Sequence, residues 1–440
     1  MPAGNPVQRP FYGVLLAPTL VLSAYGSTHV SPDHLYRPLG AFLLVTAAAV
    51  GLIGFVTGRW HAASFAASLA LFMVTGVWPL FWLLAAPWMF LLGRALLRHE
   101  GLGVTPLLTR PMNTVTTAWF VVASLTAAVA SLPHGLSPVA PASFQPQSNV
   151  YLILLDGYPR HDSLQEYFGY DNRPFLDALE QRGFEVAEHS GSHYPGTIQT
   201  VPTMMQMRPL EQLLDGDWDG SNAQHRTLWH LLNTGPVQAA YKAAGYTTYS
   251  IPSSAAGLDW RTADVVLESP WLSSFELHLA GDGILRFVLP VHAIQRASIL
   301  DAFDYLESAA GVTPRFVFAH ILSPHSPYIF AADGGPAGLC GHECTNHAGP
   351  PNRLLGERLI GQVEFLNERV LAAVDGIIEA DPDGTVIVFS DHGLRRDRAD
   401  MDEWFRILFA ARGHDFPDDV TTLDVFPALL REVDRPQAGP

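Results

Sequence analysis

Apolar and polar residues alternate in two different ways along the chain, and the change comes near residue 132. Before it, apolar residues form long runs: Phe11 to about Thr28, Leu39 to about Val56, Ala62 to Leu97, and Met112 to Leu132. The first two runs are each just long enough to cross about 30 Å of hydrocarbon. The third is too long for one span and is interrupted near Pro79, so we interpret it as a hairpin of two short spans. The pattern predicts a membrane anchor of about five helices over residues 1–132.

Arginine residues between these spans predict the orientation of the anchor, because positive charge collects on the cytoplasmic side of a membrane protein. With the hairpin in place, one arginine, Arg37, falls on one side. The others fall on the opposite side: Arg9, Arg59, Arg94, Arg98 and Arg110. The N-terminus is then cytoplasmic, and everything after Leu132 is outside. A cleaved signal peptide would leave the later spans in place. The spans carry almost no charge, so we interpret them as an anchor or lipid-access surface rather than a transport path.

Beyond the anchor, residues 133–148 are rich in Pro and Ser and predict a linker. Short apolar runs then predict strands at Asn149–Leu155, Phe184–His189, Tyr246–Ile251, Arg315–His320 and Thr385–Ser390. Amphipathic patterns predict helices at Pro174–Arg182, Val237–Ala244 and Leu355–Ile377, and residues 192–205 are typical of a strand-to-helix junction. Strands that alternate with helices indicate an α/β domain with a mostly parallel sheet over residues 149–440.

Composition excludes some classes of function. The net charge of −16 argues against nucleic-acid binding, which needs a basic surface. The 48% of hydrophobic residues is high for a soluble protein, and the excess lies in the first third of the chain. Two cysteines in 440 residues cannot build a disulfide framework.

Two of the predicted strands end in acidic residues. Asp156 follows the first buried run, and Asp391 with His392 follows the last. The carboxyl ends of parallel strands meet at one edge of a sheet, where ligands are bound. Carboxylate and imidazole together suit a divalent metal such as zinc or manganese. Taken alone, Asp156 could instead cap the following helix.

Four segments, in order, carry a family resemblance: NVYLILLDG, GTIQTVPTM, SPHSPY and VIVFSDHG. Together they resemble the sulfatase-like branch of the alkaline phosphatase superfamily, especially its membrane-anchored phosphoethanolamine and phosphoglycerol transferases. The resemblance runs from about Asn149 to Leu430, and an N-terminal anchor fits it. It implies an alkaline-phosphatase-like fold with the catalytic domain outside the cell membrane.

The resemblance also implies a metal site. Asp156, Thr197, Asp391 and His392 would hold one divalent metal, zinc or manganese. Thr197 stands five residues before the proline of the pair Val201-Pro202, as the nucleophilic threonine of these transferases does, and Thr200 is the alternative. A bound dication would activate the threonine, and a helix N-terminus would favour the phosphate. The result would be a phosphothreonine intermediate. An ordinary role for Thr197 would be a helix N-cap.

Histidines supply further candidates. His325, in a proline-bounded loop after a strand, resembles the family's histidine that contacts the substrate or leaving group, so it would stabilise a phosphoryl oxygen or protonate the leaving group. His193 and His320 are the next candidates for contacting substrate. No Cys-x-Pro-x-Arg or Ser-x-Pro-x-Arg motif lies near residue 197, which argues against a formylglycine sulfatase. After His392 we find no clear ligand set for a second metal, and His414 is a poor substitute for a histidine that lipid A transferases use downstream.

Cys340 and Cys344 enclose three residues, with His347 close by. In an oxidising external compartment we expect these cysteines to form a local disulfide rather than a zinc site.

Three hypotheses about function follow. The first is a membrane-anchored phosphotransferase that moves a phospho-substituent from a lipid donor to a cell-envelope glycan or lipid. The second is a hydrolase of phosphate or sulfate esters that uses water at the same site. The third is a degenerate, non-catalytic member of the superfamily, which the missing downstream histidine motivates and which would bind no metal.

Overall fold

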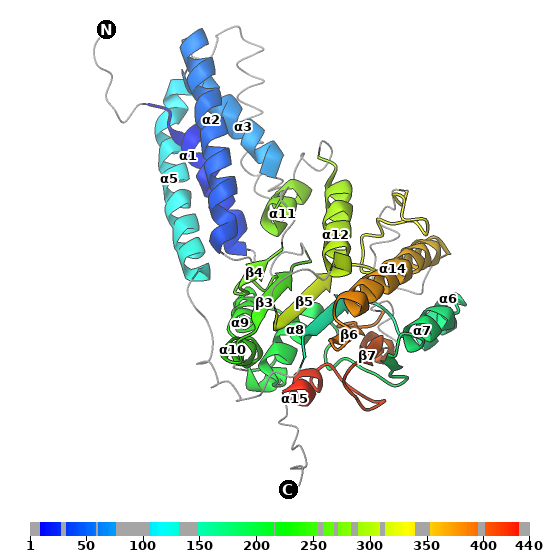
Figure 1. The fold of residues 1–440 in the computed structure, drawn as a ribbon. Helices are drawn as coiled ribbons and strands as arrows, with labels where there is room; N and C mark the ends of the chain where they lie inside the picture. Colours follow the sequence, from blue (N-terminus) through cyan, green and yellow to red (C-terminus); the bar gives the residue numbers. More distant parts are fainter. Residues whose placement is uncertain are drawn as a thin grey trace. The chain divides into compact units, whose positions relative to one another are not determined.

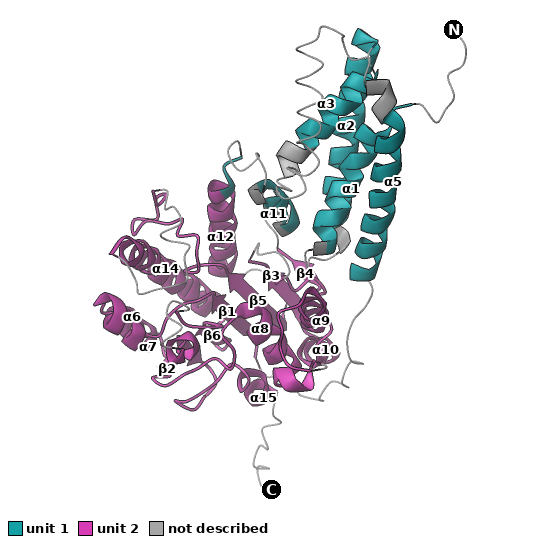
Figure 2. Ribbon diagram, turned by 180° about the vertical axis from the view of Figure 1, so that it is seen from behind, with its two compact units in different colours: residues 1–133, 272–291 teal, residues 134–271, 292–440 magenta. Residues whose placement is uncertain are grey.

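The structure is a computed structural model that describes residues 9–27, 32–58, 60–75, 105–131, 148–214, 216–253, 258–267, 272–282, 289–308, 313–338, 353–394 and 401–430. These residues form two compact units (Figure 2). The first contains residues 1–133 and 272–291, and the second contains residues 134–271 and 292–440. The sequence predicted residues 149–440 as one continuous domain, whereas the structure groups residues 272–291 with the first unit.

The first unit is helical. Its helices are α1 (Tyr12–Ser27), η2 (Pro32–Leu35), α2 (Tyr36–Thr57), α3 (Trp60–Thr75), α5 (Thr105–Ala130) and α11 (Ser274–Asp282). Helix α1 packs against α2, α3 and α5 (Figure 1). Asn113 of α5 accepts a hydrogen bond from the Tyr12 backbone N–H at 3.1 Å and donates one to the Arg9 carbonyl at 2.8 Å, which satisfies backbone groups where α1 begins.

Three predicted membrane spans coincide with helices α1, α2 and α5. By length and hydropathy, Tyr36–Thr57 and Thr109–Ala130 could cross a membrane, and Tyr12–Gly26 is apolar but shorter. Helix α3 covers the first part of the predicted hairpin, and residues 76–104 lie outside the described part of the chain. The structure therefore supports two spans by length, and the predicted number of about five stays a prediction.

Large apolar side chains are exposed mainly on this first unit. Leu44, Leu52 and Phe55 of α2 are 71%, 67% and 83% exposed, and Val122 and Leu125 of α5 are 59% and 62% exposed. In the second unit Met401 is the one large apolar residue of comparable exposure among those the structure describes. Exposed large apolar side chains in such number are typical of a protein that contacts lipid or another protein.

The second unit is built on a seven-stranded sheet in the order β2-β7-β6-β1-β5-β3-β4 (Figure 1). Its strands are β1 (Val150–Leu155), β2 (Glu185–Val186), β3 (Thr247–Ile251), β4 (Val265–Val266), β5 (Arg315–Ile321), β6 (Thr385–Phe389) and β7 (Phe409–Arg412). Strands β6, β1, β5, β3 and β4 pair in parallel, and β7 pairs antiparallel with β6 and β2. The predicted mostly parallel sheet is confirmed.

Helices cover both faces of this sheet. The face formed by Tyr151, Ile153 and Leu155 packs against the helices α6 (His161–Phe168), α7 (Arg173–Glu180), α12 (Val291–Ser308) and α14 (Arg353–Ala380). The opposite face, formed by Val150, Leu152 and Leu154, packs against α8 (Thr197–Gln206), α9 (Asn222–Asn233), α10 (Pro236–Ala243) and α15 (Val425–Leu429). The six residues of β1 are all buried because both faces are covered, which explains their continuous apolar sequence.

Candidate active site

Three neighbouring strands end at the same edge of the sheet. Central strand β1 lies between β5 and β6, and all three run parallel. Leu154 pairs in register with His320 of β5 and with Phe389 of β6. Since side chains alternate along a strand, Asp156 and Asp391, each two residues further on, are expected on the same side as His320. This is the side on which α8 packs.

Asp156 is the centre of the cluster. Its carboxylate is 2% exposed, and its Oδ2 atom accepts a hydrogen bond from His320 Nε2 at 3.1 Å. The Thr197 hydroxyl donates to the same oxygen at 3.5 Å. The other oxygen, Oδ1, lies 3.3 Å from His392 Nε2. The predicted residues Asp156, Thr197 and His392 therefore lie together in the structure.

Histidines surround this carboxylate and shift its pKa. Burial by itself would raise the pKa of Asp156. The charge of His325 and the close contacts of His320 and His392 outweigh burial and hold the pKa of Asp156 well below its usual range. The carboxylate is therefore ionised in the neutral pH range, as a metal ligand requires.

The rings of His325 and His392 meet edge to face, with centroids 5.8 Å apart. Each ring has its Nδ1 atom 2.8 Å from the carbonyl oxygen of the next residue, Ser326 or Gly393. A carbonyl only accepts hydrogen bonds, so Nδ1 carries a proton in each ring. This is the arrangement in which a carbonyl orients a metal-ligating histidine.

The backbone between the strand ends is shaped to bring these side chains close. Gly157 has a φ of +67°, and its N–H donates to Asp391 Oδ1 at 3.0 Å. A Cβ atom at this position would lie 3.0 Å from Cε1 of His392. The Ser390 hydroxyl accepts from the Tyr158 N–H at 2.8 Å and donates to the His392 carbonyl at 2.9 Å. Gly157 and Ser390 thus join the end of β1 to the end of β6.

The residues present fit a divalent metal. One ligand atom from each of Asp156, His325 and His392 lies within 4.8 Å of the others. Two buried oxygens, Asp156 Oδ1 and Asp391 Oδ2, make no hydrogen bond to any residue that the structure describes, although such atoms normally have one. The 3.3 Å between Asp156 Oδ1 and His392 Nε2 is a separation that two ligands at about 2.0–2.2 Å from one zinc ion allow. A cation at this point would satisfy both oxygens.

The structure distinguishes the two candidate threonines. Thr197 is the first residue of α8, it is 7% exposed, and its hydroxyl is directed at Asp156. The Thr200 hydroxyl instead donates to the Tyr194 carbonyl at 3.2 Å, and its side chain is fully buried. Gly196, and not Thr197, is the residue before the helix, so Thr197 is not the N-cap. This geometry favours Thr197 over Thr200.

The other predicted residues differ in their distance from this cluster. His193 is exposed and its ring lies beside Tyr194, and no contact with Asp156 is found for it in the parts of the chain that are described. His320, predicted to contact substrate, is 2% exposed and hydrogen-bonds to Asp156, and its contact with substrate stays a prediction. Cys340 and Cys344 lie outside the described residues, so their disulfide stays a prediction. His414 lies against Phe416, with ring centroids 4.9 Å apart.

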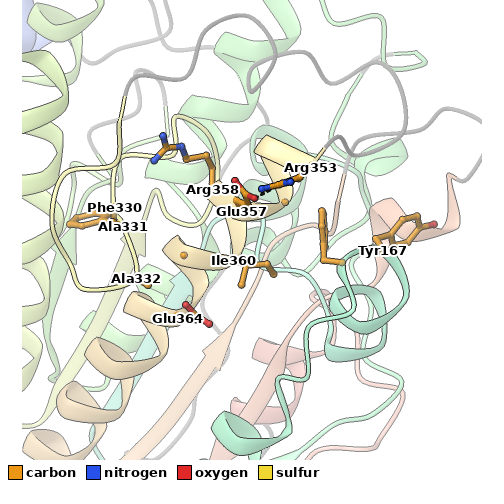
Figure 3. Close-up of a pocket in the computed structure, with 12 residues that line it drawn as sticks. Tyr167, Phe330, Ala331, Ala332, Arg353, Glu357, Arg358, Ile360 and Glu364 are labelled. Carbon is orange, nitrogen blue, oxygen red and sulfur yellow. Dashed lines mark hydrogen bonds and ion pairs between the residues drawn. The ribbon is translucent and has the colours of Figure 1, made fainter.

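A separate cavity of about 570 Å³ lies between α6, residues 330–332 and α14. Figure 3 shows that its lining carries both charges: Arg353 pairs with Glu357 at 2.7 Å, and Glu364 lies further along the helix. The lining contains none of the predicted site residues. The chemistry of the strand-end cluster, and not the size of this cavity, therefore identifies the candidate active site.

No protein-family model matches the chain, and no curated protein matches it. Solved structures do. The C-terminal periplasmic domain of EcEptC from Escherichia coli, in complex with zinc, is 16% identical with a TM-score of 0.42, over 69% of this chain and 92% of that one. The integral membrane protein lipooligosaccharide phosphoethanolamine transferase A from Neisseria meningitidis is 14% identical with a TM-score of 0.38, over 93% of this chain and 76% of that one.

A putative sulfatase from Bacteroides thetaiotaomicron is 14% identical with a TM-score of 0.42, over 67% of this chain and 73% of that one. At such identities and scores these likenesses do not decide function, which has to be argued from the residues of the chain itself.

Proposed function

We propose that this protein is a membrane-anchored, metal-dependent phosphotransferase. It moves a phospho-substituent from a lipid donor to a glycan or lipid acceptor of the cell envelope, through a phosphothreonine on Thr197. The observation that carries the proposal is the position of the Thr197 hydroxyl, 3.5 Å from Asp156 Oδ2 at the start of α8, within the cluster of carboxylates and histidines.

The metal site in this proposal consists of Asp156, Asp391 and His392, with Thr197 as the fourth ligand, and His325 lies beside it as the proton donor. His325, Asp156 and His392 are the group whose ligand atoms lie together. A zinc or manganese ion bound there lowers the pKa of a hydroxyl and neutralises phosphate charge. His320 and the Gly157 N–H orient the two carboxylates by hydrogen bonds at 3.1 and 3.0 Å.

The reaction proceeds in two displacements. Thr197 Oγ1 forms a bond to the phosphorus of the donor, and the bond from phosphorus to the donor's leaving oxygen breaks. The hydroxyl proton of Thr197 passes to solvent, and His325 supplies a proton to the leaving oxygen, so the donor alcohol departs neutral. An acceptor hydroxyl then attacks the phosphorus of the phosphothreonine, and the bond from phosphorus to Thr197 Oγ1 breaks. The acceptor's proton passes to His325, and Thr197 Oγ1 takes a proton from solvent, so both groups return to their starting states. The positive end of the α8 dipole lies where the phosphate charge develops.

The helices of the first unit support the membrane anchoring in this proposal. Helices α2 and α5 are long and apolar enough to cross a bilayer, and each exposes apolar side chains. A lipid donor is confined to the membrane, so an anchored enzyme meets it at high local concentration. The predicted external location of the second unit and the number of spans belong to this proposal.

The test is the mass of the peptide that contains Thr197, after the full chain is expressed in membranes and quenched rapidly. A phosphate-containing adduct on Thr197 is the expected result, and its added mass identifies the transferred group. Thr197→Ala should abolish turnover of a phosphodiester, while the matched variant Thr200→Ala, whose hydroxyl contacts only backbone in the structure, should retain it. Unchanged phosphodiester activity in Thr197→Ala would refute the mechanism.

A further inference from the structure

A buried glutamine on α14 contacts the loop that carries His325. Gln362 is fully buried. Its Oε1 atom accepts hydrogen bonds from the backbone N–H groups of Ile329 at 2.8 Å and Phe330 at 3.1 Å. Its Nε2 atom donates to the carbonyl oxygens of Pro324 at 3.1 Å and His325 at 3.4 Å. One side chain therefore bonds both arms of the loop between residues 324 and 330.

The same loop is attached to the end of β1. The His325 N–H donates to the Asp156 carbonyl at 2.9 Å, so the backbone of His325 is fixed to β1 by its N–H and to Gln362 by its carbonyl. The ring is fixed in turn by its own Nδ1, which lies 2.8 Å from the Ser326 carbonyl. The orientation of the imidazole toward Asp156 and His392 thus depends on the backbone that Gln362 holds.

Only an amide of this length can make these contacts. The site needs an acceptor for two N–H groups and a donor for two carbonyls, and a primary amide provides both. A carboxylate would lack the donor, and an apolar chain of similar volume would leave buried backbone groups without partners, at about 1–3 kcal/mol each.

We infer that Gln362 is a positioning residue for His325, and that it affects the reaction through His325 alone. The inference rests on the proposed function, because it assumes that His325 acts on the phosphoryl group. It adds a residue from α14, on the other face of the sheet from α8, to the machinery of the site.

The competing explanation is that Gln362 is one of several buried amides that only stabilise the fold. Asn233 of α9 provides a matched control for that role. Its Oδ1 accepts from the Arg261 N–H at 2.7 Å and its Nδ2 donates to the Asp259 carbonyl at 3.2 Å, so it also bonds a loop as both acceptor and donor. Asn233 is 7% exposed, and neither residue of that loop belongs to the strand-end cluster.

The experiment is a double-mutant cycle on the full-length protein in detergent with zinc, using hydrolysis of bis(4-nitrophenyl) phosphate as the probe reaction. The variants are Gln362→Met, His325→Ala and the double variant, with Asn233→Leu as control. A misplacement of about 1 Å can lower a rate about 100-fold, so Gln362→Met should lower kcat by about 10- to 100-fold. In the His325→Ala background the same substitution should lower kcat less than about 3-fold, because the residue through which it acts is gone.

Losses that multiply in the double variant, or a Gln362→Met kcat equal to wild type, would overturn the inference and leave the proposed function intact. An equal loss of kcat in Asn233→Leu would also overturn it, because the effect would then be one of general stability. Full activity in His325→Ala would refute both the catalytic role of His325 and the inference about Gln362. The proposed function is tested separately, by the adduct on Thr197. Should Gln362→Met fail to fold, Gln362→Glu enters the same cycle, since it keeps the shape and loses only the donor.

Discussion

Replacement of His320 by phenylalanine tests the site through the hydrogen bond that His320 gives to a proposed metal ligand, Asp156. His320 Nε2 donates to Asp156 Oδ2 at 3.1 Å, and the two side chains are 1% and 2% exposed. Phenylalanine fills a similar volume but donates no hydrogen bond. Among the described residues, Asp156 Oδ2 would then keep the longer contact with the Thr197 hydroxyl, at 3.5 Å, as its one hydrogen bond.

The size of the effect follows from these contacts. A hydrogen bond to a charged group contributes about 1.5–3 kcal/mol. Since about 1.4 kcal/mol is a factor of ten, the lost bond corresponds to roughly 10- to 150-fold. Burial raises the pKa of Asp156 and His320 helps to lower it, so the variant carboxyl binds a proton more readily. That proton competes with the metal. We therefore expect zinc affinity to fall about 10- to 100-fold, the usual effect of losing a hydrogen bond to a metal ligand.

The assay is competition between the purified protein and a chromophoric chelator for zinc, at constant pH. His414→Phe is the matched control, because His414 lies against Phe416 and belongs to no group of ligand atoms in the described chain. Thermal unfolding in excess chelator measures stability without metal for both variants. A His320→Phe protein with zinc affinity within about twofold of wild type would refute the reasoning, and so would an equal fall in His414→Phe.

Three further predictions concern other parts of the chain. Asp391→Asn should fold, because the amide oxygen of the asparagine can still accept a hydrogen bond from the Gly157 N–H. Bound zinc, measured by mass spectrometry, should fall well below the wild-type stoichiometry. Full zinc content in this variant would exclude Asp391 as a ligand. Gly157→Ala should lower the free energy of unfolding in urea by about 1–2 kcal/mol, since φ is +67° and the new Cβ would lie 3.0 Å from His392 Cε1; an unchanged unfolding midpoint would contradict this. Val45→Arg, at a 69% exposed position of α2, should impair membrane insertion at a cost of about 2.5–3.5 kcal/mol, whereas Met401→Arg should not; equal membrane fractions for both would argue against α2 as a span.

Much of the sheet could be predicted from local sequence. The central strands β1, β5 and β6 are mainly apolar, because residues buried on both faces of a sheet are mostly apolar. The inner strand β3 (TTYSI) is instead rich in the β-branched and aromatic residues that strands favour. Helices α7, α10 and α14 also lie where the apolar pattern placed them. The strand β7 was missed, and so was the two-residue strand β4, while β2 is much shorter than predicted. Strands this short carry too few residues to show a period.

The sequence also identified the residues at the strand ends, but not their arrangement. Asp156, Asp391 and His392 are visible because each follows a buried run directly. The pairing of Leu154 with His320, which brings that histidine behind Asp156, is a matter of register between strands about 160 residues apart. Local patterns hold no information about such a register.

Tertiary structure alone decided how the rest of the site is assembled. The sequence preferred Thr197 by the family resemblance alone and kept Thr200 as the alternative, whereas the start of α8 directs the Thr197 hydroxyl to Asp156 and the Thr200 hydroxyl to the Tyr194 carbonyl. Gln362 is one polar position on a long amphipathic helix, and its role follows from four backbone groups of a distant loop. The sequence thus determined which segments are buried and which polar residues follow them directly, because a buried segment is recognisable as a local run of apolar residues. The tertiary structure decided which of those residues meet, because contacts between distant segments depend on strand order, register and helix packing.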